Sequence, residues 1–226
     1  MRTLNLKDHE SFPYLTMADL GALRESLGDV PAERIWLYPL PGTANENDCV
    51  EIVESPRRRY VEMVNQTLVE KSMGMLESYL AGIIITLLNN FVIPRKLGAV
   101  LGPDGLHRMS KGNIRLPDAG FTFWRFLQAN SAGKVVSGAP QLVVEVLSES
   151  NTPREMYEKR CEYFLSGAML VWEFDCVLMR VGVYTQADAV QWVTRESILT
   201  GEPVLPGFEI NLAEVFALVE QLPTRG

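Results

Sequence analysis

The sequence predicts an α/β fold in which a mixed β-sheet carries helices on both faces. Helical and strand-like segments alternate along the 226 residues, and no internal repeat or low-complexity tract interrupts them. Residues 142–147 have the sequence LVVEVL, a nearly continuous apolar run typical of a central strand covered on both faces. Residues 152–155, TPRE, combine an N-cap threonine, a proline at the first helical position and a capping-box glutamate, so a helix starts soon after that strand.

The other elements follow from local patterns along the chain. Apolar residues at helical spacing indicate helices, and short β-rich runs between turn residues indicate strands. The N-terminal part is expected to form a helix at 17–27, with Thr16 as N-cap and Gly28 as its end, then a strand at 34–38 and a loop at 39–48. A hairpin at 60–64 and 67–70 should follow, and then a buried helix at 73–91 that Pro94 ends. Strands at 99–101 and 113–124 complete the part before the central strand. After the capped helix, which ends near residue 166, we expect strands at 169–174, 179–184 and 190–194 and a last helix at 212–221.

The length of 226 residues predicts one main domain with an added element. The strand pattern becomes regular from Arg59 onward. We therefore expect an N-terminal helix–strand extension and linker at 1–58 and an α/β core domain at 59–226.

The composition also predicts a compartment. The three cysteines, Cys49, Cys161 and Cys176, are scattered along the chain, which fits a reducing cytoplasm better than a disulfide framework. The amino terminus has no apolar secretory region. The most apolar stretch, residues 79–88, is too short to span a bilayer, so we expect no membrane association.

The net charge of −7 counts against a general nucleic-acid coat, because non-specific DNA affinity comes from neutralising phosphates. The charge is uneven, however. Residues 95–115 contain five basic side chains and one acidic side chain, for a local net charge of +4 (5 − 1). Charge alone leaves open whether this stretch contacts DNA or is a solvated surface.

Glu145 is the most informative single residue, because an ionised carboxylate inside an apolar strand is unfavourable unless a cation or several donors meet it. Asp118 lies on another expected strand, 27 residues earlier (145 − 118). That separation allows a strand, a connection and a return strand, so the two carboxylates can meet. Converging carboxylates are ligands that Mg²⁺ prefers, and such a metal activates a bound water. The alternatives are a salt bridge or strand end at Glu145 and a turn position at Asp118.

Two further residues are considered for the same site. A lysine two positions after the strand carboxylate is absent, because Leu147 stands there, and the next lysine is Lys159 on the capped helix. The alternative for Lys159 is a surface pair with Glu155 at i, i+4, which spacing alone favours. Glu77 lies on the apolar stripe of the helix at 73–91, where the alternative is a first-turn glutamate that complements the helix dipole.

Other chemistries lack the residues they require. His9 and His107 are the only histidines and have no cysteine cluster beside them, which argues against structural zinc. The sequence contains no glycine-rich nucleotide-binding loop after a strand and no Gly-x-Ser-x-Gly elbow.

Several motifs taken together resemble a known family. They are LPDAGF at 116–121, PQLVVEVLSESNT at 140–152, and Lys159 followed by Tyr163-Phe164, Gly167 and Val171-Trp172. Together with YVEMV at 60–64, LVEK at 68–71 and VLPGF at 204–208, they resemble the Uma-two (Uma2) family of restriction-endonuclease-like proteins, within the PD-(D/E)xK nuclease superfamily. The resemblance covers residues 60–216.

The resemblance implies a restriction-endonuclease-like α/β fold, with a four-stranded mixed core sheet flanked by helices on both faces. It implies that Asp118 and Glu145 hold a divalent metal, Mg²⁺ or its substitute Mn²⁺. It places the lysine on the helix, at Lys159, where it orients the attacking water or the phosphate. It also matches Glu77 to a helix glutamate that assists through a second metal or a water, and Leu147 departs from the pattern of the wider superfamily.

The expected function is therefore a cytoplasmic, Mg²⁺-dependent endonuclease that acts on DNA. We expect a homodimer, because nucleases that cut both strands tend to pair. Two alternatives stay open. The chain could have kept the fold and bind DNA through residues 95–115 without cleavage, or it could be a structural protein whose buried Glu145 is met by Arg154 or Lys159.

Overall fold

The computed structural model describes residues 17–57 and 59–223, and the described chain forms two six-stranded sheets and one two-stranded sheet with helices around them. The central sheet has the strand order β12-β11-β10-β9-β6-β3, and the second sheet has the order β2-β1-β5-β4-β8-β7. The α/β class predicted from the sequence is confirmed, although the central sheet has six strands where four were expected.

The central sheet is mixed, as predicted. Its strands are β3 (Gly98–Leu101), β6 (Ala119–Phe123), β9 (Leu142–Val146), β10 (Leu170–Asp175), β11 (Arg180–Gln186) and β12 (Ala189–Thr194). Strand β9 lies parallel to β10 and antiparallel to β6, and all of its residues are buried, as the apolar run indicated. Helix α5 (Pro153–Leu165) connects the parallel pair, and the predicted capping box between Thr152 and Glu155 starts this helix.

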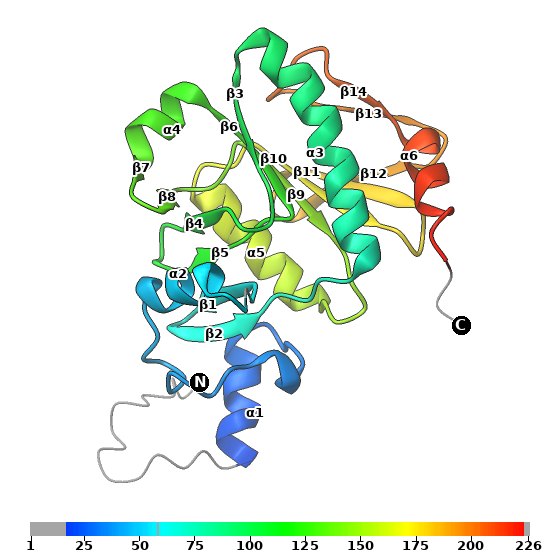
Figure 1. Ribbon diagram of the computed structural model, residues 1–226. Helices are drawn as coiled ribbons and strands as arrows, with labels where there is room; N and C mark the ends of the chain where they lie inside the picture. Colours follow the sequence, from blue (N-terminus) through cyan, green and yellow to red (C-terminus); the bar gives the residue numbers. More distant parts are fainter. Residues whose placement is uncertain (1–16, 58, 224–226) are drawn as a thin grey trace.

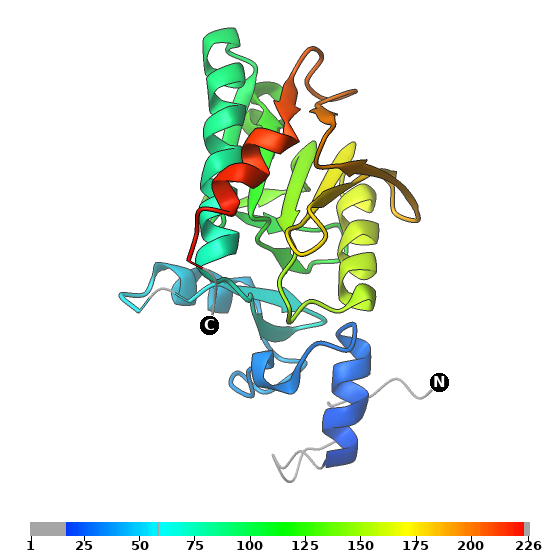
Figure 2. The same ribbon diagram turned by 90° about the vertical axis from the view of Figure 1, so that its right-hand side faces the viewer.

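Helices cover both faces of the central sheet (Figure 2). Helix α3 (Met75–Arg95) and helix α6 (Leu212–Val219) pack on one face, where the largest apolar cluster includes Ile84 of α3, Trp172 of β10 and Phe216 of α6.

Helix α5 packs on the opposite face of the sheet. There Tyr163 of α5 belongs to a second apolar cluster that includes Val143 of β9 and Val171 of β10. The side chains of β9 therefore alternate between the two helical layers, and Glu145 points with Val143 toward α5.

Helix α3 differs from the prediction in two respects. It runs to Arg95, so Pro94 lies in its last turn rather than after its end, and Lys96 in a left-handed conformation provides the C-cap. It is also buried along one stripe only, and Ile93 on the outer side is exposed. With 21 residues it is long and apolar enough to cross a membrane, unlike residues 79–88 alone. The core helix of a soluble protein can be equally long and apolar.

The second sheet lies between helix α1 (Met17–Ser26) and the central sheet (Figure 1). Its strands are β1 (Val61–Val64), β2 (Thr67–Glu70), β4 (Leu106–Arg108), β5 (Ile114–Arg115), β7 (Ser131–Ala132) and β8 (Val135–Ser137). Strands β1 and β2 form the predicted hairpin, and both turn residues, Asn65 and Gln66, have positive φ angles. Outside the two large sheets lie helix α4 (Trp124–Asn130) and the two-stranded pair β13 (Ile198–Thr200) and β14 (Glu209–Asn211).

The prediction of a single strand at 113–124 is wrong, because the chain changes sheets within it. Strand β5 belongs to the second sheet and β6 to the central sheet, with Leu116, Pro117 and Asp118 between them. Proline has no backbone N–H to donate to a ladder, which favours a break at this point. Asp118 is thereby placed at the junction of the two sheets.

The N-terminal part also departs from the prediction. The strand expected at 34–38 is replaced by a 3₁₀ turn, η2 (Ala32–Arg34), and a single bridge between Ile35 and Val69. The loop expected at 39–48 ends earlier, because Asn45 and Asp48 form a capping box that starts helix α2 (Glu46–Glu54). The predicted N-cap Thr16 lies outside the described residues.

Candidate active site

Asp118 and Glu145 lie side by side at the start of β6 and near the end of β9. The antiparallel register pairs Ala119 with Val144, so the next position along brings Asp118 opposite Glu145. Asp118 Oδ2 accepts a hydrogen bond of 2.7 Å from the backbone N–H of Val146. Both side chains are closed off from solvent, with 2% and 3% of their residue surfaces exposed. The structure thus brings together the two carboxylates that the sequence singled out.

Lys71 lies between the two carboxylates and was not identified from the sequence. It follows β2 directly, and its Nζ lies 2.8 Å from Asp118 Oδ1 and 3.6 Å from Glu145 Oε2. The same ammonium donates a hydrogen bond to the carbonyl oxygen of Leu116. Burial alone would lower the pKa of Lys71, but the charges of Asp118 and Glu145 outweigh burial and raise it, so the ammonium stays charged.

Lys159 approaches Glu145 from α5. Its Nζ lies 3.1 Å from Glu62 Oε1 and 3.6 Å from Glu145 Oε1. The surface pair with Glu155 that spacing favoured is wrong, because both side chains are buried and Glu155 instead forms two hydrogen bonds with Arg34, of 2.9 and 2.7 Å. Lys159 therefore joins Glu145 to the β1–β2 hairpin.

Tyr163 lies one helical turn after Lys159 on α5, and its hydroxyl donates a hydrogen bond of 2.5 Å to Glu145 Oε1. Burial raises the pKa of Glu145, and the charges of Lys159 and Lys71 offset only part of that rise. The ionised form of Glu145 is thus less favoured in the folded chain than in water, even with the two lysines beside it. A raised carboxylate pKa of this kind is common at functional sites.

Glu62 connects this group to a buried arginine. Arg115 of β5 donates a hydrogen bond of 2.9 Å to Glu62 Oε2 and one of 2.7 Å to Glu162 Oε2 on α5. Burial alone would raise the pKa of Glu62, but Lys159, Arg115 and Lys71 outweigh burial and hold the pKa of Glu62 well below its usual range. Because Arg115 is buried, the basic residues at 95–115 do not form one continuous surface patch.

The family of the chain follows from its similarity to known proteins. The sequence matches the family described as "Uma2: Putative restriction endonuclease" over residues 48–213, which is more than half of the chain. The chain belongs to the Uma2 family. No curated protein matches the sequence.

A solved structure has the same fold. It is a crystal structure described as a putative nuclease belonging to DUF820 from Anabaena variabilis, and it is 13% identical in sequence with a TM-score of 0.63. The match covers 70% of this chain and 90% of that one. At this identity the likeness establishes the fold alone, and the Uma2 match establishes the family.

Glu77 is the one residue of the expected Uma2 site that the structure does not bring to the pair. Its carboxylate accepts a hydrogen bond of 2.9 Å from the backbone N–H of Gly74, the N-cap residue, and so caps the start of α3. This arrangement corresponds to the alternative of a first-turn glutamate. Arg154 likewise lies elsewhere, because its guanidinium contacts Asp29 and Glu158 at the surface.

A groove of about 1050 Å³ is lined by residues that neighbour the carboxylate site along the chain, but not by Asp118 or Glu145 themselves. Ser72, which follows Lys71, and Leu147, two residues after Glu145, both line it. Its lining includes five acidic and two basic side chains, for a net charge of −3 (2 − 5). The basic residues, Arg160 and Arg180, each contact an acid of the same lining, so the groove has no excess positive charge for phosphate.

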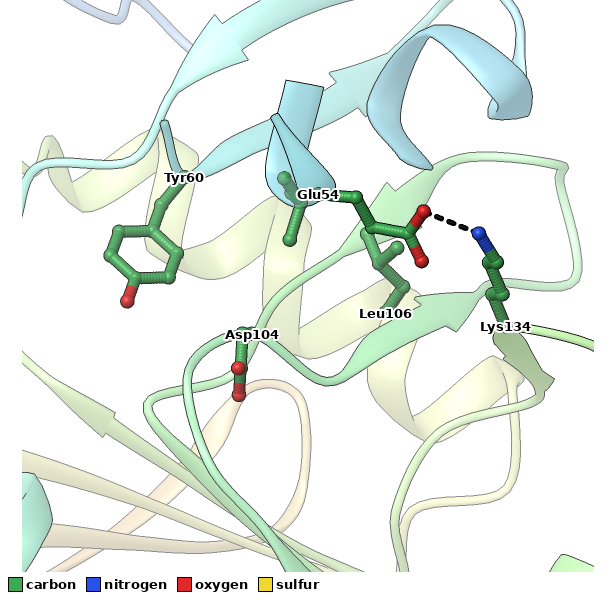
Figure 3. A pocket seen from close by; sticks show the side chains of 6 residues that line it. Glu54, Tyr60, Asp104, Leu106 and Lys134 are labelled. Atoms are coloured by element: carbon green, nitrogen blue, oxygen red, sulfur yellow. Dashed lines mark hydrogen bonds and ion pairs between the residues drawn. The ribbon is translucent and has the colours of Figure 1, made fainter. Parts of the chain in front are cut away.

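A second, smaller pocket of about 200 Å³ lies on the second sheet. Figure 3 shows the carboxylate of Glu54 facing the ammonium of Lys134, with Tyr60 and Asp104 on the other side of the pocket. Among the described residues, those that line this pocket are separate from the carboxylate site. Substitution of its exposed charged residues should therefore leave the carboxylate site unchanged.

Proposed function

We propose that the chain is a divalent-metal-dependent endonuclease that hydrolyses phosphodiester bonds in DNA, with Asp118 and Glu145 as the metal ligands. The observation that carries the proposal is the convergence of one oxygen from each carboxylate on a single cation, the Lys71 ammonium, at 2.8 and 3.6 Å. Such a pair of oxygens fits a divalent ion as well. The Uma2 membership supports the nuclease assignment.

The donor set fits Mg²⁺ or Mn²⁺ better than zinc or calcium. In residues 17–57 and 59–223 no group of three or more His, Cys, Asp or Glu side chains is arranged to hold a metal. Two carboxylates suit Mg²⁺, which keeps several waters and often takes the remaining ligands from substrate phosphate. Asp118 Oδ1, a buried oxygen whose polar partner among the described residues is the Lys71 ammonium, also fits a cation ligand. When bound, the metal supplies an activated water and offsets charge on the phosphate.

The other residues act on the two ligands. The Tyr163 hydroxyl and the Val146 N–H each fix one oxygen of a carboxylate, which orients Glu145 and Asp118. Lys159 supplies a positive charge 3.6 Å from Glu145 that favours its ionised form. We assign Lys159 this positioning role in addition to the role toward water or phosphate expected from the sequence. We assign Glu77 no role in the metal site, because it caps α3.

Plasmid nicking tests the proposal. Supercoiled DNA is incubated with Mg²⁺ or Mn²⁺ and the wild type, Asp118→Asn or Glu145→Gln, variants that remove charge and keep shape. We expect each variant to lose more activity than the roughly 10–100-fold typical of residues that only support a metal ligand. Asp104→Asn, an exposed acid of the pocket in Figure 3, serves as the control and should nick like the wild type. Unchanged nicking by both site variants would show that the site is assigned wrongly.

One observation favours a second function, a nuclease fold that binds DNA without cleaving it. The position between the carboxylates is filled by Lys71, and the site is closed off from solvent. This alternative predicts retention of DNA without nicking in either metal ion. The acidic lining of the groove counts against strong non-specific retention. The homodimer and the cytoplasmic location stay predictions, and a solution mass measurement tests the first.

A further inference from the structure

Each of the two carboxylates around Lys71 has one oxygen fixed by the surrounding protein and one oxygen that faces the Lys71 ammonium. Asp118 Oδ2 is fixed by the Val146 N–H at 2.7 Å, and Glu145 Oε1 is fixed by the Tyr163 hydroxyl at 2.5 Å. The other oxygen of each carboxylate, Asp118 Oδ1 and Glu145 Oε2, faces the Lys71 ammonium. The two fixed oxygens keep the carboxylates in place whether or not Lys71 is present.

The contact between Lys71 and Asp118 is a short ion pair. Lys71 Nζ lies 2.8 Å from Asp118 Oδ1, and this oxygen has no other polar partner among the described residues. A lysine ammonium is a compact point charge on a flexible stem, so to leave this position Lys71 breaks the ion pair and its hydrogen bond to the Leu116 carbonyl, but no rigid hydrogen-bond fork. The groove lies next to Lys71 along the chain, because Ser72 lines it.

We propose that Lys71 is an exchangeable internal cation, which occupies the divalent-metal position between Asp118 and Glu145 and must leave it when a metal binds. The displaced ammonium moves toward the groove, where substrate phosphate would meet it. This inference rests on the proposed metal site. It gives both buried carboxylates a positive partner when no metal is bound, and it makes Lys71 a competitor that sets the metal affinity.

Metal titration of Lys71→Met tests the inference. Mn²⁺ binding is measured calorimetrically at one fixed pH for the wild type, for Lys71→Met and for Lys134→Met, the control in which an exposed lysine paired with Glu54 is changed. A cation this close changes the affinity of a carboxylate for a competing cation by about 10- to 1,000-fold, so Lys71→Met should bind Mn²⁺ at least roughly tenfold more tightly than the wild type. Lys134→Met should bind it like the wild type.

The outcomes separate the two proposals. Equal or weaker Mn²⁺ binding by folded Lys71→Met, with measurable binding by the wild type, overturns the exchange and leaves the metal site intact. Absence of binding in both proteins overturns the exchange and the metal site together. Tighter binding by Lys71→Met supports both, because loss of a merely structural contact does not increase metal affinity.

A second measurement uses the wild type and does not depend on the folding of a variant. Accessible lysines are acetylated for a short time with and without Mn²⁺, and the modified positions are found by mass spectrometry. Lys71 should become severalfold more reactive with the metal, while Lys159, which is also buried, should not change. Unchanged or reduced reactivity of Lys71 at metal concentrations that saturate the wild type overturns the inference.

Discussion

Two buried charge clusters meet at Glu62, and they use different cations. In the arginine cluster, Arg115 binds Glu62 and Glu162 through directed hydrogen bonds of 2.9 and 2.7 Å. In the lysine cluster, made of Lys71, Lys159, Asp118 and Glu145, the ammonium–carboxylate distances between its own members are 2.8, 3.6 and 3.6 Å. The guanidinium presents a rigid fork, whereas the ammonium acts as a point charge. The arginine cluster thus fixes the fold, and the lysine cluster can change its cation.

The positions of the two clusters agree with a structural role for the arginine cluster and a metal-binding role for the lysine cluster. Arg115 joins β5 of the second sheet to Glu162 of α5, so its loss would affect the packing of the two layers. The lysine cluster lies at the junction where the chain enters the central sheet, next to the groove. Each of its carboxylates also has one oxygen held by the scaffold.

The largest effect is expected for Arg115→Met. Removing one partner of a buried ion pair leaves the other charges uncompensated, which typically costs about 3–5 kcal/mol of stability. The free energy of unfolding is measured by urea denaturation. The control is Arg108→Met, because Arg108 forms hydrogen bonds of 2.5 and 2.6 Å with Glu46 but has 42% of its side-chain surface exposed. Such an exposed pair should cost no more than about 1 kcal/mol. Equal losses in the two variants would remove the structural role assigned to Arg115.

The sequence predicted the parts of this arrangement that have local signals. The apolar run around Glu145, the capping box of α5 and the two-residue turn of the hairpin are each encoded within a few neighbouring residues. Asp118 and Glu145 were found because a carboxylate in an apolar run requires a partner. The helix α2 was missed although Asn45 and Asp48 form a capping box, because the surrounding Pro, Gly and Asn residues indicated a loop.

The partners of the carboxylates could not be predicted in the same way. Lys71 and Asp118 are 47 residues apart (118 − 71), and no periodic pattern in either segment marks the contact. The only local signal is a lysine at a buried strand end, next to Leu68 and Val69. The change of sheet near Pro117 also moves Arg115 into the interior, whereas its sequence context indicated a basic surface.

The next comparison is between Glu62→Gln and Glu145→Gln. Glu62 accepts hydrogen bonds from Arg115 and the Leu116 N–H, and hydrogen bonds to charged groups contribute roughly 1.5–3 kcal/mol each. We expect Glu62→Gln to lose about that amount and Glu145→Gln to lose less, because burial already disfavours the ionised form of Glu145. A larger loss for Glu145→Gln in urea denaturation at pH 7 would reverse the roles of the two clusters.

The pH dependence of stability tests the same difference. The folded-state pKa of Glu62 is lowered, so its contribution is present above the usual pKa of 4.5 and is lost as the pH falls below that value. The unfolding free energy of the wild type should therefore fall more steeply below pH 4.5 than that of Glu62→Gln. Parallel curves for the two proteins would show that Glu62 is not held ionised by its cations.

A smaller loss of stability than that of Glu62→Gln is expected for Tyr163→Phe. The change removes one buried hydrogen bond to Glu145 and keeps the ring in place, so we expect a loss of about 1–2 kcal/mol. Its effect on metal binding is more informative. Without the hydroxyl, Glu145 Oε1 is no longer fixed, and Mn²⁺ affinity should fall by roughly tenfold, as for other residues that orient a metal ligand.

Tyr163 and Lys71 contact opposite oxygens of the same carboxylate, so their variants should change metal affinity in opposite directions. Calorimetric titration of Lys71→Met and Tyr163→Phe under identical conditions measures this difference directly. If both variants weaken Mn²⁺ binding, the two oxygens of Glu145 have the same role and Lys71 is part of the scaffold. If only Lys71→Met strengthens binding, the oxygen facing Lys71 is the one that exchanges its cation.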